Sequence, residues 1–197
     1  FEDVGGLVAL FGNLAPDGAI LKRSAADPTL FESTGRAVVF TSLEDLAKRI
    51  DSDDLDVKAD DVLVLQNAGP KSPSGMPEAG YIPIPKKLAR AGIKDMVRIS
   101  DCRMSGTAFG TIVLHVTPET TVGGPIGLVQ NGDEIRLSIS NKSLDLLVDD
   151  QELERRRRTT PLKPATPARG YAKLYADHVT QAGQGADFDF LMAPTKA

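Results

Sequence analysis

The sequence predicts a mainly β fold with flanking helices, either a closed β-barrel or a closed sandwich, and three observations support this prediction. Glycine and proline are frequent, with 18 and 13 residues respectively, and they separate short apolar runs. Such runs are typical of strands rather than of long helices. The predicted helices are few and unevenly spaced, so a doubly wound parallel sheet, which needs a helix after most strands, is the second choice.

Eight segments have the composition of strands. The last two form a predicted hairpin, because turn-prone residues at positions 140–143 separate two segments of alternating polarity. In the first of these segments Ile135, Leu137 and Ile139 share one face, as expected for a half-buried strand. The predicted strands, in order along the chain, are residues 7–10, 37–41, 62–66, 96–100, 112–116, 127–129, 134–139 and 144–148.

Three helices are predicted from the residues at their ends. Ser42 can cap a helix over residues 43–50, because its hydroxyl can accept a hydrogen bond from a free amide of the first turn. A helix over residues 86–91 follows two prolines and ends at Gly92. A helix over residues 149–158 begins with acids and ends with four arginines, which matches the helix dipole. These arginines are interpreted as a solvated helix end rather than as a phosphate-binding patch.

The chain is expected to contain one barrel domain, residues 1–158, followed by residues 159–197, which form a Pro-rich connector and a C-terminal helix. In that helix, predicted over residues 171–182, apolar side chains recur at helical spacing, so the helix is expected to dock on the same domain. The residues predicted to dock are Tyr171, Leu174, Tyr175 and Val179.

Composition excludes several classes of function. The net charge of −4 argues against a nucleic-acid or anionic membrane surface. No apolar run approaches the roughly 20 residues that a membrane helix needs. The single cysteine, Cys102, allows neither an intrachain disulfide nor an all-cysteine metal site, and a cytoplasmic location is expected. Residues 1–4 resemble neither a signal peptide nor a translation start, so the chain is expected to be part of a longer one.

The segment from Ser100 to Gly110 carries two hydroxyls, on Ser105 and Thr107, among small residues. A serine at a Gly-rich strand end can expose its hydroxyl, and neighbouring amides can then point at an anion. The pattern differs from the Gly-x-Ser-x-Gly elbow and has no adjacent base, so activation would need a metal or preorganised donors. From composition alone, a turn serine without a chemical role is the more frequent case.

Glu78 ends a second unusual loop, residues 69–78, in which proline fixes the turn before the carboxylate. A carboxylate oxygen suits a hard cation such as Mg²⁺, but one carboxylate does not make a site, and spacing alone favours an exposed loop acid. Asp101 is interpreted as facing solvent at a strand end, His115 as a structural residue, and Cys102 as a small buried side chain.

Several blocks, in the right order over nearly the whole chain, resemble the C-terminal domain of the dihydroxy-acid and sugar-acid dehydratases, the family of dihydroxyacid dehydratase and phosphogluconate dehydratase. The wording Met-Ser-Gly-Thr-Ala-Phe-Gly at 104–110 looks like the pentonate and hexonate branch, of the arabinonate, xylonate or galactonate type. Cys102 departs from the family, which usually has alanine or glycine there. The other matching blocks are Gly-Asn-Leu-Ala-Pro-Asp-Gly at 12–18, the loop 69–78, Arg-Ile-Ser-Asp at 98–101, His-Val-Thr-Pro-Glu at 115–119 and Gly-Gly-Pro at 123–125.

The resemblance implies a hydro-lyase that dehydrates a sugar acid, a 2,3-dihydroxy acid, to a 2-keto-3-deoxy acid. It implies an iron–sulfur cluster and Mg²⁺, both held mainly by an N-terminal domain that this chain lacks. Ser105 matches the serine proposed to take the C2 proton, Thr107 a neighbouring hydroxyl at the substrate, and Glu78 a magnesium ligand. The resemblance also implies a swivelling, aconitase-like barrel and a homo-oligomeric full-length enzyme, and this chain alone is expected to be inactive.

Two alternatives stay open. One is the dihydroxyacid dehydratase of branched-chain amino-acid biosynthesis, and the other is a non-catalytic β-barrel that binds an acid or a partner protein. The expected partners of the first interpretation are a small sugar-acid substrate and the chain's own N-terminal domain, with no nucleic acid and no membrane.

Overall fold

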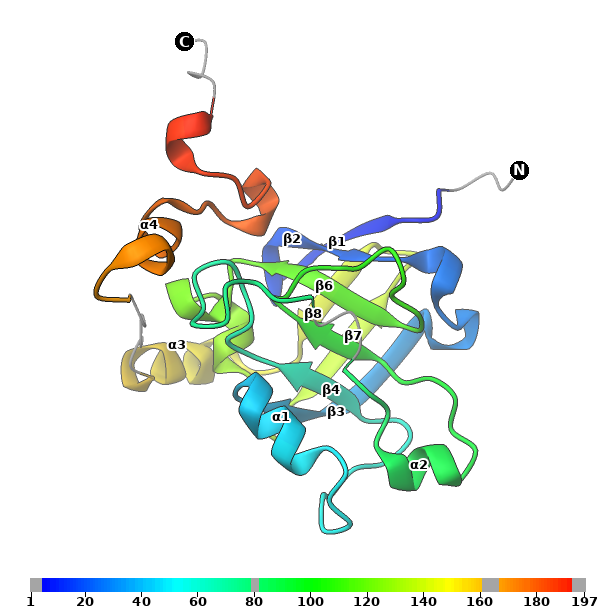
Figure 1. The fold of residues 1–197 in the computed structure, drawn as a ribbon. Helices are drawn as coiled ribbons and strands as arrows, with labels where there is room; N and C mark the ends of the chain where they lie inside the picture. Colours follow the sequence, from blue (N-terminus) through cyan, green and yellow to red (C-terminus); the bar gives the residue numbers. More distant parts are fainter. Residues whose placement is uncertain (1–4, 79–81, 161–166, 193–197) are drawn as a thin grey trace.

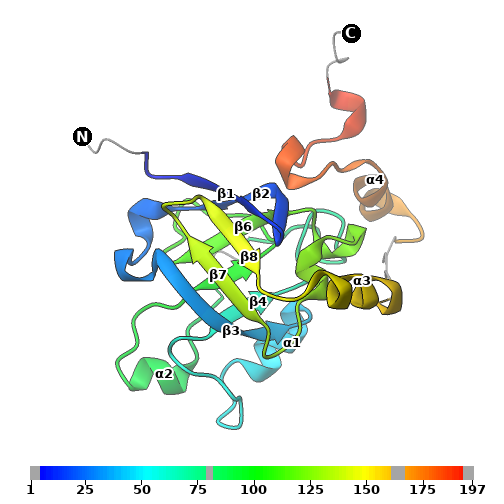
Figure 2. The ribbon, with the colours of Figure 1, turned by 180° about the vertical axis from the view of Figure 1, so that it is seen from behind.

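The computed structural model describes residues 5–78, 82–160 and 167–192, and the strands within them close into one barrel of eight (Figures 1 and 2). Around the barrel the strands follow the order β1-β2-β6-β5-β4-β3-β7-β8. This confirms the predicted closed barrel and rules out the doubly wound sheet. The strands are β1 (Val8–Gly12), β2 (Ala15–Leu21), β3 (Glu32–Phe40), β4 (Val62–Leu65), β5 (Arg98–Ser100), β6 (Ile112–Thr117), β7 (Glu134–Ser138) and β8 (Ser143–Leu146).

Half of the barrel is a parallel sheet. Strands β3, β4, β5 and β6 run parallel to one another, with Leu65 of β4 beside Ser100 of β5. The remaining pairs are antiparallel except the one that closes the barrel, and they include the predicted hairpin of β7 and β8. Because parallel strands end at the same edge, the loops after β4 and β5, which carry Glu78 and Ser105, leave the barrel at the same end.

The barrel closes between β1 and β8, which pair in parallel at Phe11 and Ser143. The side chain of Asn13 extends this short contact. Its Nδ2 donates to the carbonyl oxygen of Leu146 at 2.8 Å, and its Oδ1 accepts the N–H of Leu146 at 2.7 Å. An asparagine side chain therefore takes the place of a peptide group in the ladder, because it has the same donor and acceptor.

The apolar residues form two cores on either side of the barrel wall. One cluster receives side chains from all eight strands, so it fills the barrel interior. The other lies outside the wall, under the helices, and includes Leu46 of the first helix. Strand β4 shows how one segment serves both: Val62 and Val64 face the interior, whereas Leu63 and Leu65 belong to the outer cluster.

Among the described residues, four α-helices lie outside the barrel (Figure 1). The predicted cap of α1 is present, since Ser42 Oγ accepts the N–H of Asp45 at 3.2 Å. The predicted helix over 171–182 ends earlier, at His178, and a separate short 3-10 turn, Ala182–Gln184, begins at the last residue of the predicted range. The helices are α1 (Leu43–Arg49), α2 (Lys86–Arg90), α3 (Asp150–Thr159) and α4 (Gly170–His178). None of the helices in the described part of the chain has the length and apolar content that crossing a bilayer requires.

One strand was not predicted, and one strand prediction is wrong. Residues 15–21 form β2 although Pro16, Asp17 and Gly18 suggest a turn, because the tight turn after Gly12 pairs this segment with β1. Residues 127–129 were expected to be a strand but lie mostly in a 3-10 helix, Pro125–Leu128. The proline at its first position favours a helical turn over a strand.

Helix α4 and the segment that follows it contact the barrel through only some of the side chains expected to dock. Of the residues expected to dock, Val179 is buried, while Tyr171 and Leu174 are exposed. Gln181 makes a direct bond to the loop after β6, because its Nε2 donates to Glu119 Oε1 at 2.7 Å. The predicted connector falls partly on residues 161–166, outside the described residues, and the division of the chain at residue 158 stays a prediction.

Candidate functional site

The two candidate hydroxyls of the segment 100–110 lie in contact with each other. Ser105 Oγ and Thr107 Oγ1 lie 2.9 Å apart, and the N–H of Thr107 donates to Ser105 Oγ at 3.1 Å. Ser105 is half-buried and Thr107 is exposed. The turn therefore directs one amide donor at the oxygen of Ser105 and places a second hydroxyl within hydrogen-bond distance of it, which is the preorganisation that an ionised serine would need.

The turn that carries Ser105 is held from both sides. On one side the N–H of Met104 donates to His115 Nε2 at 2.8 Å. On the other side Lys22 Nζ donates to the carbonyl oxygen of Gly106 at 2.7 Å. A cavity of about 570 Å³ lies beside this turn, and Ser105, His115 and Lys22 are among the residues that line it. Its volume is within the range of small-molecule sites.

Glu78 reaches the neighbourhood of Ser105 through Arg103. The Arg103 guanidinium lies 3.6 Å from Glu78 Oε2, and the two residues also form an isolated parallel bridge of the backbone. Both side chains are exposed, at 41% for Glu78 and 51% for Arg103. Glu78 is not one of the residues that line the cavity beside Ser105. The Glu78 carboxylate and the hydroxyl pair therefore lie on adjoining loops without direct contact. The residue that Glu78 meets, Arg103, precedes Ser105 by two positions in the chain.

Asp101 contradicts its sequence interpretation, because it is fully buried rather than facing solvent. Its Oδ1 accepts the N–H of Ala68 at 2.9 Å, and its Oδ2 accepts the N–H of Thr120 at 2.9 Å. Burial raises the pKa of this carboxyl, while the two amide donors oppose the increase. One carboxylate therefore ties together the loops after β4 and β6.

Glu119 holds the loop that carries Glu78 through hydrogen bonds to its backbone. Its two oxygens accept the N–H of Lys71 at 2.9 and 3.1 Å. Burial raises the pKa of Glu119, and the nearby Asp101 carboxylate adds to the increase. At Gly69 a Cβ atom would lie 2.2 Å from Glu119 Oε2, so this carboxylate occupies the space of the missing side chain. Sequence reasoning missed both acids, although each follows a strand by no more than two residues and adjoins a loop of the site.

The residues of this chain do not fit an iron–sulfur cluster, and they fit Mg²⁺ only in part. In the ranges that the structure describes, no three His, Cys, Asp or Glu side chains are grouped to hold a metal ion. Cys102 is buried and is the single cysteine, so it cannot form a cluster ligand set. Glu78 can provide one oxygen ligand to Mg²⁺, in competition with Arg103.

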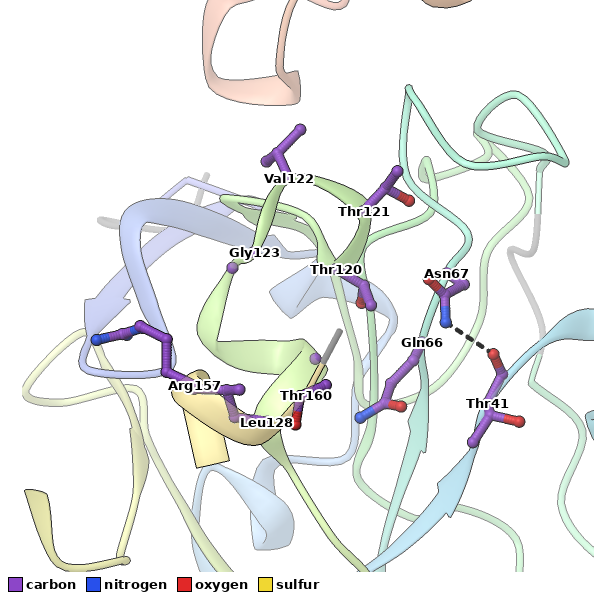
Figure 3. Close-up of a pocket in the computed structure, with 12 residues that line it drawn as sticks. Thr41, Gln66, Asn67, Thr120, Thr121, Val122, Gly123, Leu128, Arg157 and Thr160 are labelled. Carbon is purple, nitrogen blue, oxygen red and sulfur yellow. Dashed lines mark hydrogen bonds between the residues drawn. The ribbon is translucent and has the colours of Figure 1, made fainter. Parts of the chain in front are cut away.

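A second cavity, of about 490 Å³, lies beyond the ends of β3 and β4 (Figure 3). Thr41 and Asn67 line one wall, and Asn67 Nδ2 donates to the Thr41 carbonyl oxygen at 3.0 Å. Thr120 and Gly123 belong to the facing turn, and Arg157 comes from α3. None of the predicted site residues lines this cavity, so it is separate from the candidate site.

The fold and the site define a closed β-barrel domain that presents a hydroxyl pair and a carboxylate on loops at one end of a parallel sheet. Residues 1–186 match the protein family described as dihydroxy-acid/6-phosphogluconate dehydratase, C-terminal. The chain belongs to this family and corresponds to the C-terminal domain of its dehydratases, as the sequence blocks predicted.

Individual relatives agree with this assignment. A 6-deoxy-6-sulfo-D-gluconate dehydratase of Pseudomonas putida is 52% identical over 187 residues, covering 95% of this chain and 32% of the relative. An L-arabinonate dehydratase of Rhizobium leguminosarum bv. trifolii (strain WSM2304) is 50% identical with the same coverage. A dihydroxy-acid dehydratase of Syntrophobacter fumaroxidans is 41% identical over 188 residues, covering 94% of this chain and 33% of the relative. The chain spans about a third of the length of these relatives.

Proposed function

We propose that this chain is the C-terminal part of a hydro-lyase that converts a sugar acid, a 2,3-dihydroxy acid, to a 2-keto-3-deoxy acid. The observation that carries the proposal is the Ser105–Thr107 hydroxyl pair beside a cavity, in a chain of a dehydratase family. The choice of a sugar acid is supported by identities of 52% and 50% to two sugar-acid dehydratases, against 41% to a dihydroxy-acid dehydratase.

In the proposed reaction the Ser105 alkoxide takes the proton from C2 while the C3–O bond breaks, and the departing hydroxide gains one proton and leaves as water. The resulting enol becomes the ketone when its oxygen loses a proton and C3 gains one. A serine hydroxyl is too weak an acid to be ionised in water, so its alkoxide must be stabilised. The N–H of Thr107 already donates to Ser105 Oγ, and the Thr107 hydroxyl is close enough to do the same. The proposal gives Thr107 this role, together with contact to the substrate.

The proposal assigns the remaining parts of the site to the N-terminal part of a longer enzyme. An iron–sulfur cluster and Mg²⁺, held mainly there, would supply Lewis acidity, and Glu78 would add one oxygen ligand to Mg²⁺. Two large apolar side chains near Ser105 support a covering partner. Phe109, in the same loop, is 74% exposed, and Leu7, which lines the cavity, is 61% exposed.

The experiment that tests the proposal is the substitution Ser105→Ala in the full-length enzyme. We expect a loss of turnover of at least about 10²- to 10⁴-fold, the usual contribution of a positioned proton acceptor, with unchanged cluster absorbance. Ser140→Ala is the matched control, because Ser140 is exposed in the turn between β7 and β8. Turnover retained by Ser105→Ala would remove Ser105 from the mechanism.

The choice of substrate is tested on the wild-type full-length enzyme in the same assay. Pentonates and hexonates are expected to be dehydrated faster than dihydroxyisovalerate. The opposite order would assign the chain to the branched-chain pathway enzyme instead. If none of these acids is dehydrated, the result favours the alternative of a non-catalytic binding barrel over both kinds of dehydratase.

A further inference from the structure

His115 has an unusual backbone conformation for a residue inside a strand. Its φ is +58°, in the left-handed region, although it lies in the middle of β6. The pairing of β6 with β2 is irregular here: Ile20 pairs with Leu114, and the next pair joins Gly18 to Thr117. Two steps along β2 thus match three along β6, which is a bulge. Bulges redirect side chains and occur often beside active sites, and left-handed residues other than glycine cost about 1–3 kcal/mol.

The redirected residue binds the segment that leads to Ser105 at two points. The N–H of His115 donates to the carbonyl oxygen of Cys102 at 2.9 Å. Its ring Nε2 accepts the N–H of Met104 at 2.8 Å. The regular pairing of β5 with β6 has ended by then, since its last pair is Ile99 with Val113. The ring nitrogen of His115 therefore takes the place of the next backbone carbonyl in the ladder of β5 and β6. It extends the pairing past the end of β5.

These two bonds enclose Arg103 and end one residue before Ser105. Arg103 is the residue whose guanidinium lies 3.6 Å from Glu78 Oε2. The same anchor consequently sets the position of the Ser105 hydroxyl on one side and of the Arg103–Glu78 pair on the other. To accept from Met104, Nε2 must carry no proton, so the ring is neutral with its hydrogen on Nδ1. Burial and the charge of Arg103 lower the pKa of His115, which favours this neutral form.

We propose that His115 is a positioning residue that fixes Ser105 relative to Glu78 through its ring acceptor on Met104; this rests on the proposed function. Lys22 completes the arrangement from the other side of Ser105, through the carbonyl of Gly106. Geometric errors of about 1 Å at a reacting group cost on the order of 10²-fold in rate. Loss of the ring acceptor of His115 should therefore lower kcat and leave substrate binding unchanged.

The test compares two variants of the full-length enzyme. Asparagine tolerates the left-handed backbone but is too short to reach the N–H of Met104, so His115→Asn removes only the anchor. Glutamine places an amide oxygen near the position of Nε2, so His115→Gln restores the acceptor. We expect kcat of His115→Asn to fall about 10²-fold at unchanged KM, and His115→Gln to recover most of it. His178→Asn is the control, since His178 is the only other histidine in the sequence and lies on α4.

Hydrogen exchange of the same proteins gives a second measurement that does not depend on turnover. The amides of residues 103–107 should exchange faster in His115→Asn than in wild type, and His115→Gln should return them toward the wild-type rate. Unchanged exchange or unchanged kcat in His115→Asn would overturn the proposal. So would failure of His115→Asn to fold while His178→Asn folds, because His115 would then serve folding alone.

Failure of the proposed function is recognised separately. If Ser105→Ala retains turnover, the proposed role of Ser105 fails, and the positioning role of His115 fails with it. If Ser105 is essential and the His115 variants behave like wild type, only the positioning role is lost.

Discussion

Glu119 and Asp101 are buried carboxylates that accept hydrogen bonds from backbone amides. Between them they accept from Ala68 and Lys71 in the loop after β4 and from Thr120 in the loop after β6, so two buried side chains hold these loops together. The pKa of each is raised chiefly by burial. Each ionised carboxylate therefore costs stability near neutral pH, in return for a fixed arrangement of loops.

This arrangement predicts a pH dependence for Glu119→Gln. The raised pKa of Glu119 means that its contribution to stability is present below about pH 4.5 and is lost as pH rises through the raised value, because the unfolded carboxyl ionises first. Glutamine keeps one oxygen acceptor and does not titrate. The free energy of unfolding of Glu119→Gln, relative to wild type, should increase with pH by at most about 1.4 kcal/mol per unit and then level off.

Urea denaturation between pH 4.5 and pH 8 measures this difference. Glu44→Gln is the control, because a backbone amide and Ser42 lower the pKa of Glu44. The contribution of Glu44 is already present above about pH 4.5, so the difference between Glu44→Gln and wild type should stay nearly constant over this range. A difference between Glu119→Gln and wild type that stays constant with pH would contradict the prediction.

Single residues differ in how far sequence could reveal their place. Ser105 and Thr107 could be placed in one Gly-containing segment in advance, whereas the contact between their hydroxyls is seen only in the structure. The burial of Asp101 could not, since its amide partners lie 33 and 19 residues away in loops whose paths depend on the whole barrel. His115 was interpreted as structural, and its contact with Met104 follows from a bulge that one strand alone does not define.

At the scale of elements, α3 shows that a run of like charges can serve two purposes. Arg155, Arg157 and Arg158 are exposed and pair with glutamates on the same helix, as a solvated helix end should. Arg156 is different: it is buried, and its guanidinium donates to both oxygens of Asp133, at 2.5 and 3.0 Å. It fastens α3 to the loop before β7.

We expect Arg156→Ala to lower the free energy of unfolding by about 3–5 kcal/mol, because it leaves the carboxylate of Asp133 buried without its partner. Arg158→Ala, one of the exposed members of the run, should change stability by no more than about 0.5 kcal/mol. Thermal or urea unfolding of the two variants measures the contrast. Equal effects would show that the buried pair has no special weight.

The elements that sequence predicted best are those whose signal is local. The cap at Ser42 and the hairpin of β7 and β8 depend on a few adjacent residues, and both are present. Strand β2 was missed because its first residues have turn composition, and only its partners β1 and β6 make it a strand. Conversely, the apolar residues at 127–129 are buried without being a strand, because burial in a 3-10 turn leaves the same apolar signal.

The whole molecule is a barrel whose reactive side chains gather at one end and remain incomplete as a site. Glu78 is a single exposed carboxylate. The cavity beside Ser105 is lined in part by Leu7, an apolar side chain that is exposed to solvent. The chain also spans about a third of the length of its relatives. We therefore expect the 197-residue chain, produced alone, to unfold cooperatively yet to form no 2-keto acid from any sugar acid.

Circular dichroism during thermal unfolding and a 2-keto-acid assay measure the two halves of this expectation. The full-length enzyme at equal concentration is the positive control of the assay. Turnover by the isolated chain would contradict a site shared with an N-terminal part, and it would require a metal-independent route within this barrel.

The seam between β1 and β8 has a consequence for synthesis on the ribosome. Phe11 pairs with Ser143, so the strand that emerges first within this domain waits for one made more than a hundred residues later. Until that strand has left the exit tunnel, β1 and β2 can form their hairpin while the ring around them stays open. Distant pairings of this kind slow folding and leave strand edges exposed in the meantime. The nascent chain should thus depend most on chaperones in the interval between the translation of residue 21 and that of residue 146.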